Sequence, residues 1–179
     1  GNSSDVARAV AVDASGSAFV VGETSSAGFP VTPGAPQAAY GGGTLAGGDA
    51  FAVKLNAAGN ALGYATYLGG RSADHAYAVA VDAAEQVTVV GATCAAGFPT
   101  THCALATSYR GGGDAFLVRL SAVGGLGYGT FLGGGSADAA CGVALDALGD
   151  AYVVGETCSS GFPVTVGAFD TSHNGCQDA

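Results

Sequence analysis

The sequence contains no methionine or tryptophan, and only 5 of its 179 residues are lysine or arginine. Proteins that bind nucleic acid carry clustered basic side chains, which neutralise phosphates. Here the formal net charge is −9 and the few basic residues are scattered, which argues against a nucleic-acid partner and against binding to an anionic membrane surface. The basic residues are Arg8, Lys54, Arg71, Arg110 and Arg119.

Long hydrophobic runs are also missing. A membrane-spanning helix needs roughly 18 or more consecutive apolar residues, and every apolar stretch here is broken by glycine or polar residues. No signal peptide is visible, and an opening Gly1 in place of methionine favours a processed or excised segment. Helix signals are weak because the alanine-rich stretches are interrupted by many of the 32 glycines.

What the chain does contain is an internal repeat. The motif Val-Ala-(Val/Leu)-Asp begins at Val10, Val79 and Val143, in steps of 69 and then 64 residues. Gly-Phe-Pro recurs with the same two steps. Gly-Gly-Asp-Ala-Phe and an aromatic-Leu-Gly-Gly motif each occur twice between these anchors. Internal repeats are considered before a fold is assigned, and this one divides the chain into units, the third of them partial, at 1–70, 71–134 and 135–179.

Each complete unit is predicted to contain four β-strands. The third strand of the first unit alternates Phe51, Val53 and Leu55 with smaller or polar residues, which is the period of a strand. The first strand is apolar on both faces, which predicts a sheet packed between two layers. The four strands of the first unit are expected near 6–13, 17–24, 50–56 and 61–68.

The connections differ in character. The segments 13–17 and 56–60 combine Asp or Asn with glycine, as tight turns between antiparallel strands require. The corresponding segment of the second unit, 82–86, lacks glycine, so its turn is less well defined. The connection from the second to the third strand spans about 25 residues, a length that indicates either a function or internal ties.

Four short antiparallel strands per unit, repeated, are typical of β-propeller blades. The motifs above, together with Phe-Val-Val-Gly-Glu-Thr and Gly-Phe-Pro-Val-Thr-Pro-Gly-Ala, resemble the bacterial SBBP repeat over nearly the whole chain. The resemblance implies a secreted or surface-exposed bacterial repeat protein and carries no catalytic motif. Ten strands would not close a propeller, so we expect either a longer chain or neighbouring copies that pair with uncovered sheet edges.

Most of the 14 acidic residues recur at equivalent positions of the repeats. A catalytic site needs one set of residues, so recurring acids favour a task performed in every unit. The first interpretation is capping of turns and loops through backbone N–H groups, and the alternative is calcium binding by oxygen ligands on one rim. The calcium candidates are Asp5, Asp74, Asp138, Asp49, Asp114 and Asp178.

The five cysteines have no spacing typical of a zinc site. Cys94 and Cys103 bracket one loop, and Cys158 and Cys176 bracket its equivalent, so two loop-closing disulfides are predicted, with buried thiols as the alternative. Cys141 is left over and is expected to be a packed free thiol.

No catalytic constellation is visible. His75, His102 and His173 occupy non-equivalent positions and are expected in loops or on the surface. The tyrosines are expected to pack within the sheets rather than form a sugar platform. The function hypothesis is therefore a non-enzymatic extracellular structural or interaction module, without a cofactor and with protein partners or self-association. The alternatives are a filament subunit, a calcium- or carbohydrate-binding propeller and, least favoured, a propeller lyase or hydrolase.

Overall fold

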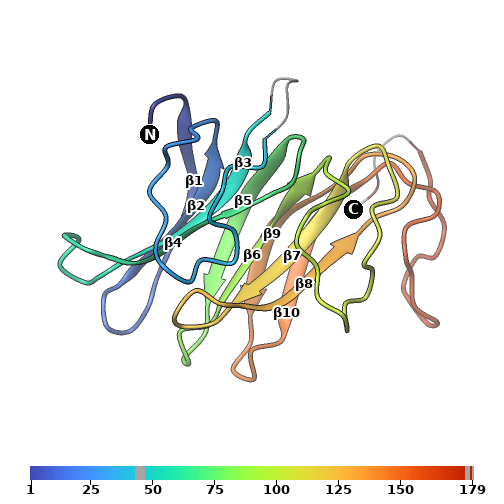
Figure 1. The fold of residues 1–179 in the computed structure, drawn as a ribbon. Helices are drawn as coiled ribbons and strands as arrows, with labels where there is room; N and C mark the ends of the chain where they lie inside the picture. The colour runs from blue at the N-terminus through green and yellow to red at the C-terminus, as the bar shows by residue number, and fades with distance from the viewer. Residues whose placement is uncertain (43–46, 176–177, 179) are drawn as a thin grey trace.

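The computed structural model describes all residues except 43–46, 176–177 and 179. The described residues form ten β-strands and no helix (Figure 1). Their bounds agree with the predicted strands to within one or two residues. The strands are β1 (Asp5–Val12), β2 (Ala18–Thr24), β3 (Asp49–Leu55), β4 (Leu62–Leu68), β5 (Asp74–Val81), β6 (Val87–Thr93), β7 (Asp114–Leu120), β8 (Leu126–Leu132), β9 (Asp138–Leu145) and β10 (Ala151–Thr157).

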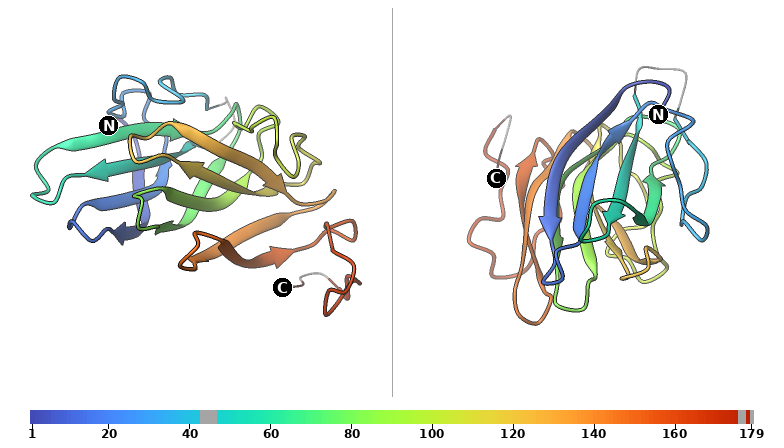
Figure 2. Two further views of the ribbon diagram at one scale, coloured as in Figure 1. Left: turned by 90° about the horizontal axis from the view of Figure 1, so that it is seen from below. Right: turned by 90° about the vertical axis from the view of Figure 1, so that its left-hand side faces the viewer.

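The strands form three antiparallel sheets, one for each repeat. The first has the order β1-β2-β3-β4 and the second β5-β6-β7-β8, whereas β9 and β10 form a two-stranded third sheet. A bridge between Thr157 and Asp178 occupies the place where β3 begins on β2. The expected all-β fold with four-stranded antiparallel sheets is confirmed. The sheets lie in a row that is not closed on itself, with the third sheet at one end (Figures 1 and 2).

The sheets pack face to face and converge at their first strands. Strand β5 contacts β1, β2 and β3 of the sheet before it, and β9 contacts β5, β6 and β7. The expectation that every first strand is covered on both sides holds for β5, which is at least half-buried throughout. It is wrong for β1, most of which is exposed because the first sheet has a neighbour on one side only.

The main core lies between the first and second sheets. Phe19 and Val21 of β2, each 1% exposed, belong to the same apolar cluster as Val87 and Val89 of β6. Full burial of one such side chain stabilises the fold by about 1.5–3 kcal/mol. Alanines at the contact, such as Ala76, allow the backbones to approach closely. Tyr64 and Tyr67 are buried in the first sheet, as their predicted packing role requires.

In each complete sheet, the long connection between the second and third strands forms hydrogen bonds with the outer strand. Thr32 donates its backbone N–H to Ala65 of β4 (3.0 Å), and Tyr67 of β4 donates back to Gln37 (3.2 Å). In the second repeat Thr101 makes the equivalent bond to Gly129 of β8 (2.9 Å). Such a cover protects an edge from pairing with another chain. The outer edges of β4 and β8 are therefore covered by segments of their own repeats.

The turn that lacks glycine has the same form as its counterparts. Glu85 adopts a φ of 60°, in the left-handed region that Gly16 occupies in the first repeat. Backbone N–H groups of Ala84 and Gln86 donate to the Asp82 carboxylate, each at 2.8 Å. An ion pair of 2.6 Å joins Glu85 to Lys54 of the neighbouring sheet. A side chain at this φ costs conformational energy, and here the same side chain, Glu85, also links two repeats through its ion pair.

Candidate functional site at the inner strands

The first strand of every repeat contains a β-bulge at the same position. The strand pairing skips one residue in β1, β5 and β9, and the extra residues are Arg8, Tyr77 and Cys141. A bulge turns the side chain of its extra residue away from the regular alternation. Since β5 contacts both β1 and β9, the three bulges lie along the converging edges of the sheets.

The glycine of the Val-Val-Gly motif lies opposite each bulge. A Cβ on Gly22 or Gly91 would lie 1.9 Å from a backbone carbonyl oxygen of the first strand, and one on Gly155 would lie 2.0 Å away. Real Cβ atoms are not found at such distances, so the bulge is compatible only with glycine here. Every repeat therefore requires glycine at this position, because the bulge leaves no room for a Cβ atom.

The residues at the first two bulges belong to a cluster that joins the first and second sheets. Arg8 donates through Nη2 and Nε to the Glu23 carboxylate, at 2.8 and 3.1 Å. The other contact of Glu23 is with Nδ1 of His75 on β5. The ring of Tyr77 stacks on that of His75, with centroids 6.0 Å apart, and the Arg8 guanidinium lies 5.6 Å from the Tyr77 ring centroid.

The cluster is electrostatically balanced and partly open to solvent. The side chains of Arg8, Glu23 and His75 are 40%, 20% and 32% exposed. Burial alone would raise the pKa of Glu23, but hydrogen bonds from Arg8 and His75 outweigh it and lower that pKa. The hydrogen bond with Glu23 raises the pKa of Arg8. These charges hold the two sheets together at their inner edge.

Sequence reasoning missed this cluster. His75, predicted in a loop or on the surface, lies in the strand β5, where Glu23 and Tyr77 cover part of its side chain and leave 32% of it exposed. The signal in the sequence was that the bulge position carries a different residue type in each repeat: arginine, tyrosine and cysteine. Most residues around the bulge repeat closely. The residue at the bulge does not, so the repeats differ in chemistry at this position.

The recurring acids cap turns and loops, as the first interpretation predicted. Asp13 accepts backbone N–H bonds from Ser15 and Ser17, both at 2.9 Å. Asp146 does the same with Leu148 and Asp150, again at 2.9 Å. At the other end of the strands, the acids that begin β1, β5 and β9 each accept a threonine hydroxyl from the next strand.

Two acids of neighbouring repeats meet at each junction. A Cβ on Gly69 would lie 2.6 Å from Oδ2 of Asp74 and 2.9 Å from Cγ of Asp49. Gly133 marks the same meeting of Asp138 with Asp114, whose oxygens lie 2.6 and 3.1 Å from that point. All four carboxylates are at most 3% exposed. The predicted common rim for these two sets of acids is thus confirmed.

One oxygen at each junction has no hydrogen-bond partner. Oδ1 of Asp49 and Oδ1 of Asp114 are both buried and unpaired. The second oxygen of Asp49 accepts N–H bonds from Gln37 (2.7 Å) and Gly41 (2.8 Å). Burial raises the pKa of Asp74 to about 7, despite hydrogen bonds from Thr93 and Gly70 that lower it. Burial also raises the pKa of Asp49.

The remaining calcium candidates are Asp178 and Asp5. Asp178 accepts a backbone N–H from Asn174, as Asp114 does from Arg110. Across the described residues, three or more His, Cys, Asp or Glu side chains nowhere converge in a way that could hold a metal ion. Asp5, the sixth calcium candidate, lies at the start of β1 beside Thr24.

The structure corrects one prediction about cysteine. Cys94 and Cys103 are exposed and no disulfide joins them in the structure, so their pairing stays a prediction. Cys141 is exposed at the bulge of β9 and not packed. Cys176, the expected partner of Cys158, lies outside the described residues.

No family model matches the chain, and no curated protein matches it. Within the part of the chain that the structure describes, no helix is long and apolar enough to cross a membrane.

Proposed function

We propose that the chain is a non-enzymatic extracellular module built from propeller-type blades. It acts by presenting its surface to protein partners or by associating with further copies or blades. The observation that carries the proposal is that two complete repeats fold into equivalent sheets, stacked face to face and converging at their first strands. Blades around a propeller axis have this arrangement. The resemblance to the SBBP repeat supports a bacterial surface location and a place within a larger protein or assembly.

The inner cluster also favours a non-enzymatic role. Arg8 directs two donors at Glu23, and Glu23 in turn contacts His75, so these groups neutralise one another. A propeller lyase or hydrolase would need an acid or base with a lone pair or proton directed at substrate. We therefore assign the cluster to holding the first two blades together at their inner edge.

The third sheet provides the surface for association. Tyr152 is 62% exposed, whereas its counterpart Phe19 is 1% exposed beneath the next sheet. Stacking of another blade on this face would bury Tyr152 in the same way. Heterologous contacts that do not close continue into filaments, so the filament is the form of assembly that this face favours.

We expect the purified chain to associate through this face. Sedimentation should show species larger than the monomer, and electron microscopy should separate fibres from discrete particles. Tyr152→Lys should return the protein to a monomer, because it places a charge on the stacking face. The matched control is Val123→Lys, at an 84%-exposed residue in the β7–β8 turn, which should associate like the parent. A single compact monomer for the parent chain would refute the proposal.

Calcium binding is the second candidate function, because Oδ1 of Asp49 and Oδ1 of Asp114 lack partners. Calcium takes 6–8 oxygen ligands, whereas the other Asp49 oxygen already accepts two N–H groups. We therefore expect calorimetric titration with calcium to give no heat and no change in thermal midpoint. Binding of about two ions per chain, reduced to about one in Asp49→Asn, would establish calcium as the ligand of the junctions.

A further inference from the structure

A pocket of about 500 Å³ opens where the second repeat begins. Its walls come from the residues that follow β4, from the start of the connection between β6 and β7, and from Tyr109 near the end of that connection. The chain has 14 acidic residues, yet the described residues that line this pocket include no aspartate or glutamate. Its polar side chains are those of Arg71, Ser72, Cys94 and Tyr109.

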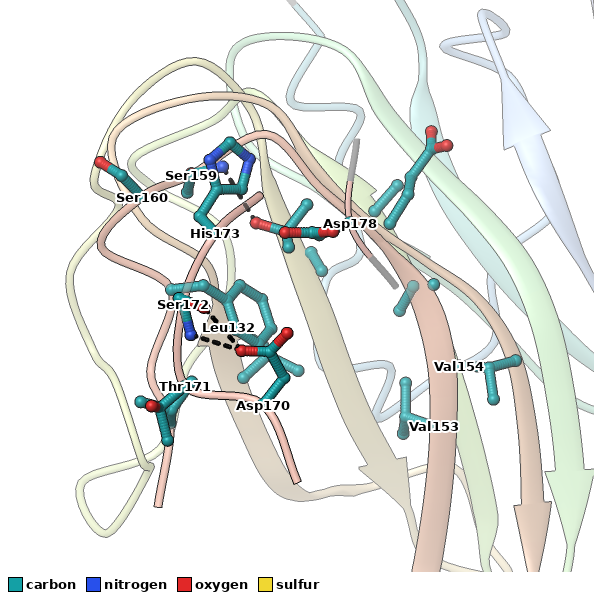
Figure 3. Close-up of a pocket in the computed structure, with 18 residues that line it drawn as sticks. Leu132, Val153, Val154, Ser159, Ser160, Asp170, Thr171, Ser172, His173 and Asp178 are labelled. Carbon is teal, nitrogen blue, oxygen red and sulfur yellow. Dashed lines mark hydrogen bonds between the residues drawn. The ribbon is translucent and has the colours of Figure 1, made fainter. Parts of the chain in front are cut away.

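The backbone N–H of Ser72 lacks the acceptor that the other repeats provide. In the third repeat the N–H of Ser136 donates to Oγ of Ser159, a residue drawn in Figure 3, at 2.9 Å. The first repeat has the same bond to a serine hydroxyl at 2.8 Å. Ala95 occupies this position in the second repeat and lines the pocket. Among the described residues no hydrogen bond uses the Ser72 N–H, so this donor is available to a ligand.

Arg71 is a second unused donor. Arg8 and Lys54 form ion pairs, whereas none of the ion pairs among the described residues includes Arg71. Its side chain is exposed, and its counterparts in the other repeats are Asn2 and Gly135. A residue that departs from the repeat favours a task that is performed once, and here it coincides with the loss of the serine hydroxyl in the same repeat.

Tyr109 adds a third donor. Its hydroxyl oxygen accepts the N–H of Gly113 at 2.9 Å, which leaves the hydroxyl hydrogen free to donate. A guanidinium, a backbone N–H and a hydroxyl are the groups that bind carboxylate and phosphate oxygens in proteins. The pocket therefore has the donor set of a site for a small anion.

Two carboxylates lie behind the pocket wall. Gly41 and Gly70 line the pocket and donate their N–H groups to Asp49 and Asp74, each at 2.8 Å. Negative charge on these acids opposes an anion. Burial raises the pKa of Asp74 to about 7, so its charge is lost below that pH. An anion should therefore bind more tightly at pH 6.5 than at pH 8.

We propose that this pocket binds an oxyanion, a carboxylate or phosphate group, held by the Arg71 guanidinium, the Ser72 N–H and the Tyr109 hydroxyl. One oxygen of the anion accepts the N–H that a serine Oγ accepts in the other repeats. The planar guanidinium can bind two oxygens of either group. The site goes beyond the proposed function, because it adds a small ligand and does not depend on association through the third sheet.

Thiol labelling of the whole, reduced chain tests this site. Cys94 lines the pocket, whereas Cys103 is also exposed but does not line it. At pH 6.5, acetate or phosphate should slow labelling of Cys94 by N-ethylmaleimide about threefold or more relative to chloride at equal ionic strength, because a bound anion limits access to the thiol. Labelling of Cys103 should not change. Mass spectrometry of the peptides measures both rates, and the more protective anion identifies the group that the site prefers.

Three variants link the protection to the proposed donors. Arg71→Gln should raise the anion concentration needed for protection about tenfold or more, because a charge-assisted bond is lost. Arg110→Gln is the matched control, since it removes the same charge from an exposed arginine outside the pocket, and it should keep the protection. Ala95→Ser should weaken binding about threefold, because the new Oγ accepts the Ser72 N–H. Equal slowing of Cys94 and Cys103, or full protection in Arg71→Gln, would overturn the proposal.

Discussion

Gly91→Ala is expected to lower the free energy of unfolding by about 4 kcal/mol, near the upper end of single substitutions. The new Cβ would lie 1.9 Å from the carbonyl oxygen of His75 and 2.9 Å from Cε1 of Phe116. One contact is backbone and the other is a completely buried ring, so neither can move aside cheaply. The bulge at Tyr77 would have to open, and β5 would lose its register with β6.

Urea unfolding followed by circular dichroism measures this effect. Gly97→Ala is the matched control, because its Cβ would meet nothing within 4 Å, and it should change stability by less than about 0.5 kcal/mol. Gly22→Ala makes the same close approach in the first sheet, beside a largely exposed β1. Its cost should therefore be smaller than that of Gly91→Ala. Equal losses in Gly91→Ala and Gly97→Ala would show that the bulge glycine has no special role.

The same glycine shows what sequence patterns can predict. The four strands of each unit were predictable because alternating residues and turn motifs recur in every repeat. The bulge was not, since Ala7, Arg8 and Ala9 read as uninterrupted strand until the pairing with Gly22 and Val21 is known. An extra residue in one strand is a property of two strands together. For this reason the Arg8–Glu23–His75–Tyr77 cluster could not be predicted from residue spacing.

The acids were predicted more successfully. Their recurrence correctly indicated capping, and the expected common rim brings Asp49 next to Asp74. What the repeat could not reveal is the unpaired oxygen of Asp49, because hydrogen-bond satisfaction depends on packing at the junction. The sequence left open whether the long connections have a function or serve as internal ties. The hydrogen bond between Thr32 and Ala65 supports internal ties, and it could not be predicted because the two residues are distant in sequence.

The junction acids make stability depend on pH. Burial raises the pKa of Asp74 from 3.8 to about 7, so between these values the folded protein binds a proton that the unfolded chain releases. The contribution of Asp74 to stability is therefore greatest below about pH 4, falls as the pH rises toward 7 and then levels off. One group with this shift contributes a fall of about 4 kcal/mol. Burial raises the pKa of Asp114 as well, which acts in the same direction.

Urea unfolding at pH values from 4 to 8 should show this fall, and Asp74→Asn should reduce it strongly. The amide of asparagine is neutral at every pH, so no carboxylate has to be deprotonated inside the junction. Because the amide lacks one acceptor oxygen for Thr93 or Gly70, Asp74→Asn should lose some stability at pH 4. A profile as steep in Asp74→Asn as in the parent would rule out Asp74 as the responsible group.

A difference between repeats offers a second and milder variant. In the third repeat Ser159 donates its hydroxyl to Oδ2 of Asp138 at 2.8 Å, whereas Ala95 stands at the equivalent place beside Asp74. Gly134 and Gly70 lie equally close to Ser159 and Ala95, which indicates that a hydroxyl also fits at the first junction. A hydrogen bond to a carboxylate stabilises its charged form.

Ala95→Ser should therefore lower the pKa of Asp74 and raise stability at pH 8 by about 1.5–3 kcal/mol, with little change at pH 4. Ser159→Ala is the reciprocal variant, because it removes the hydroxyl that donates to Asp138, and it should lower stability. The new hydroxyl acts on the charged carboxylate, so a gain of equal size at both pH values would mean that it improves packing instead. A gain in Ala95→Ser that is confined to high pH, together with a loss in Ser159→Ala, would establish that hydrogen-bond donors at the junctions decide how tightly neighbouring repeats hold together.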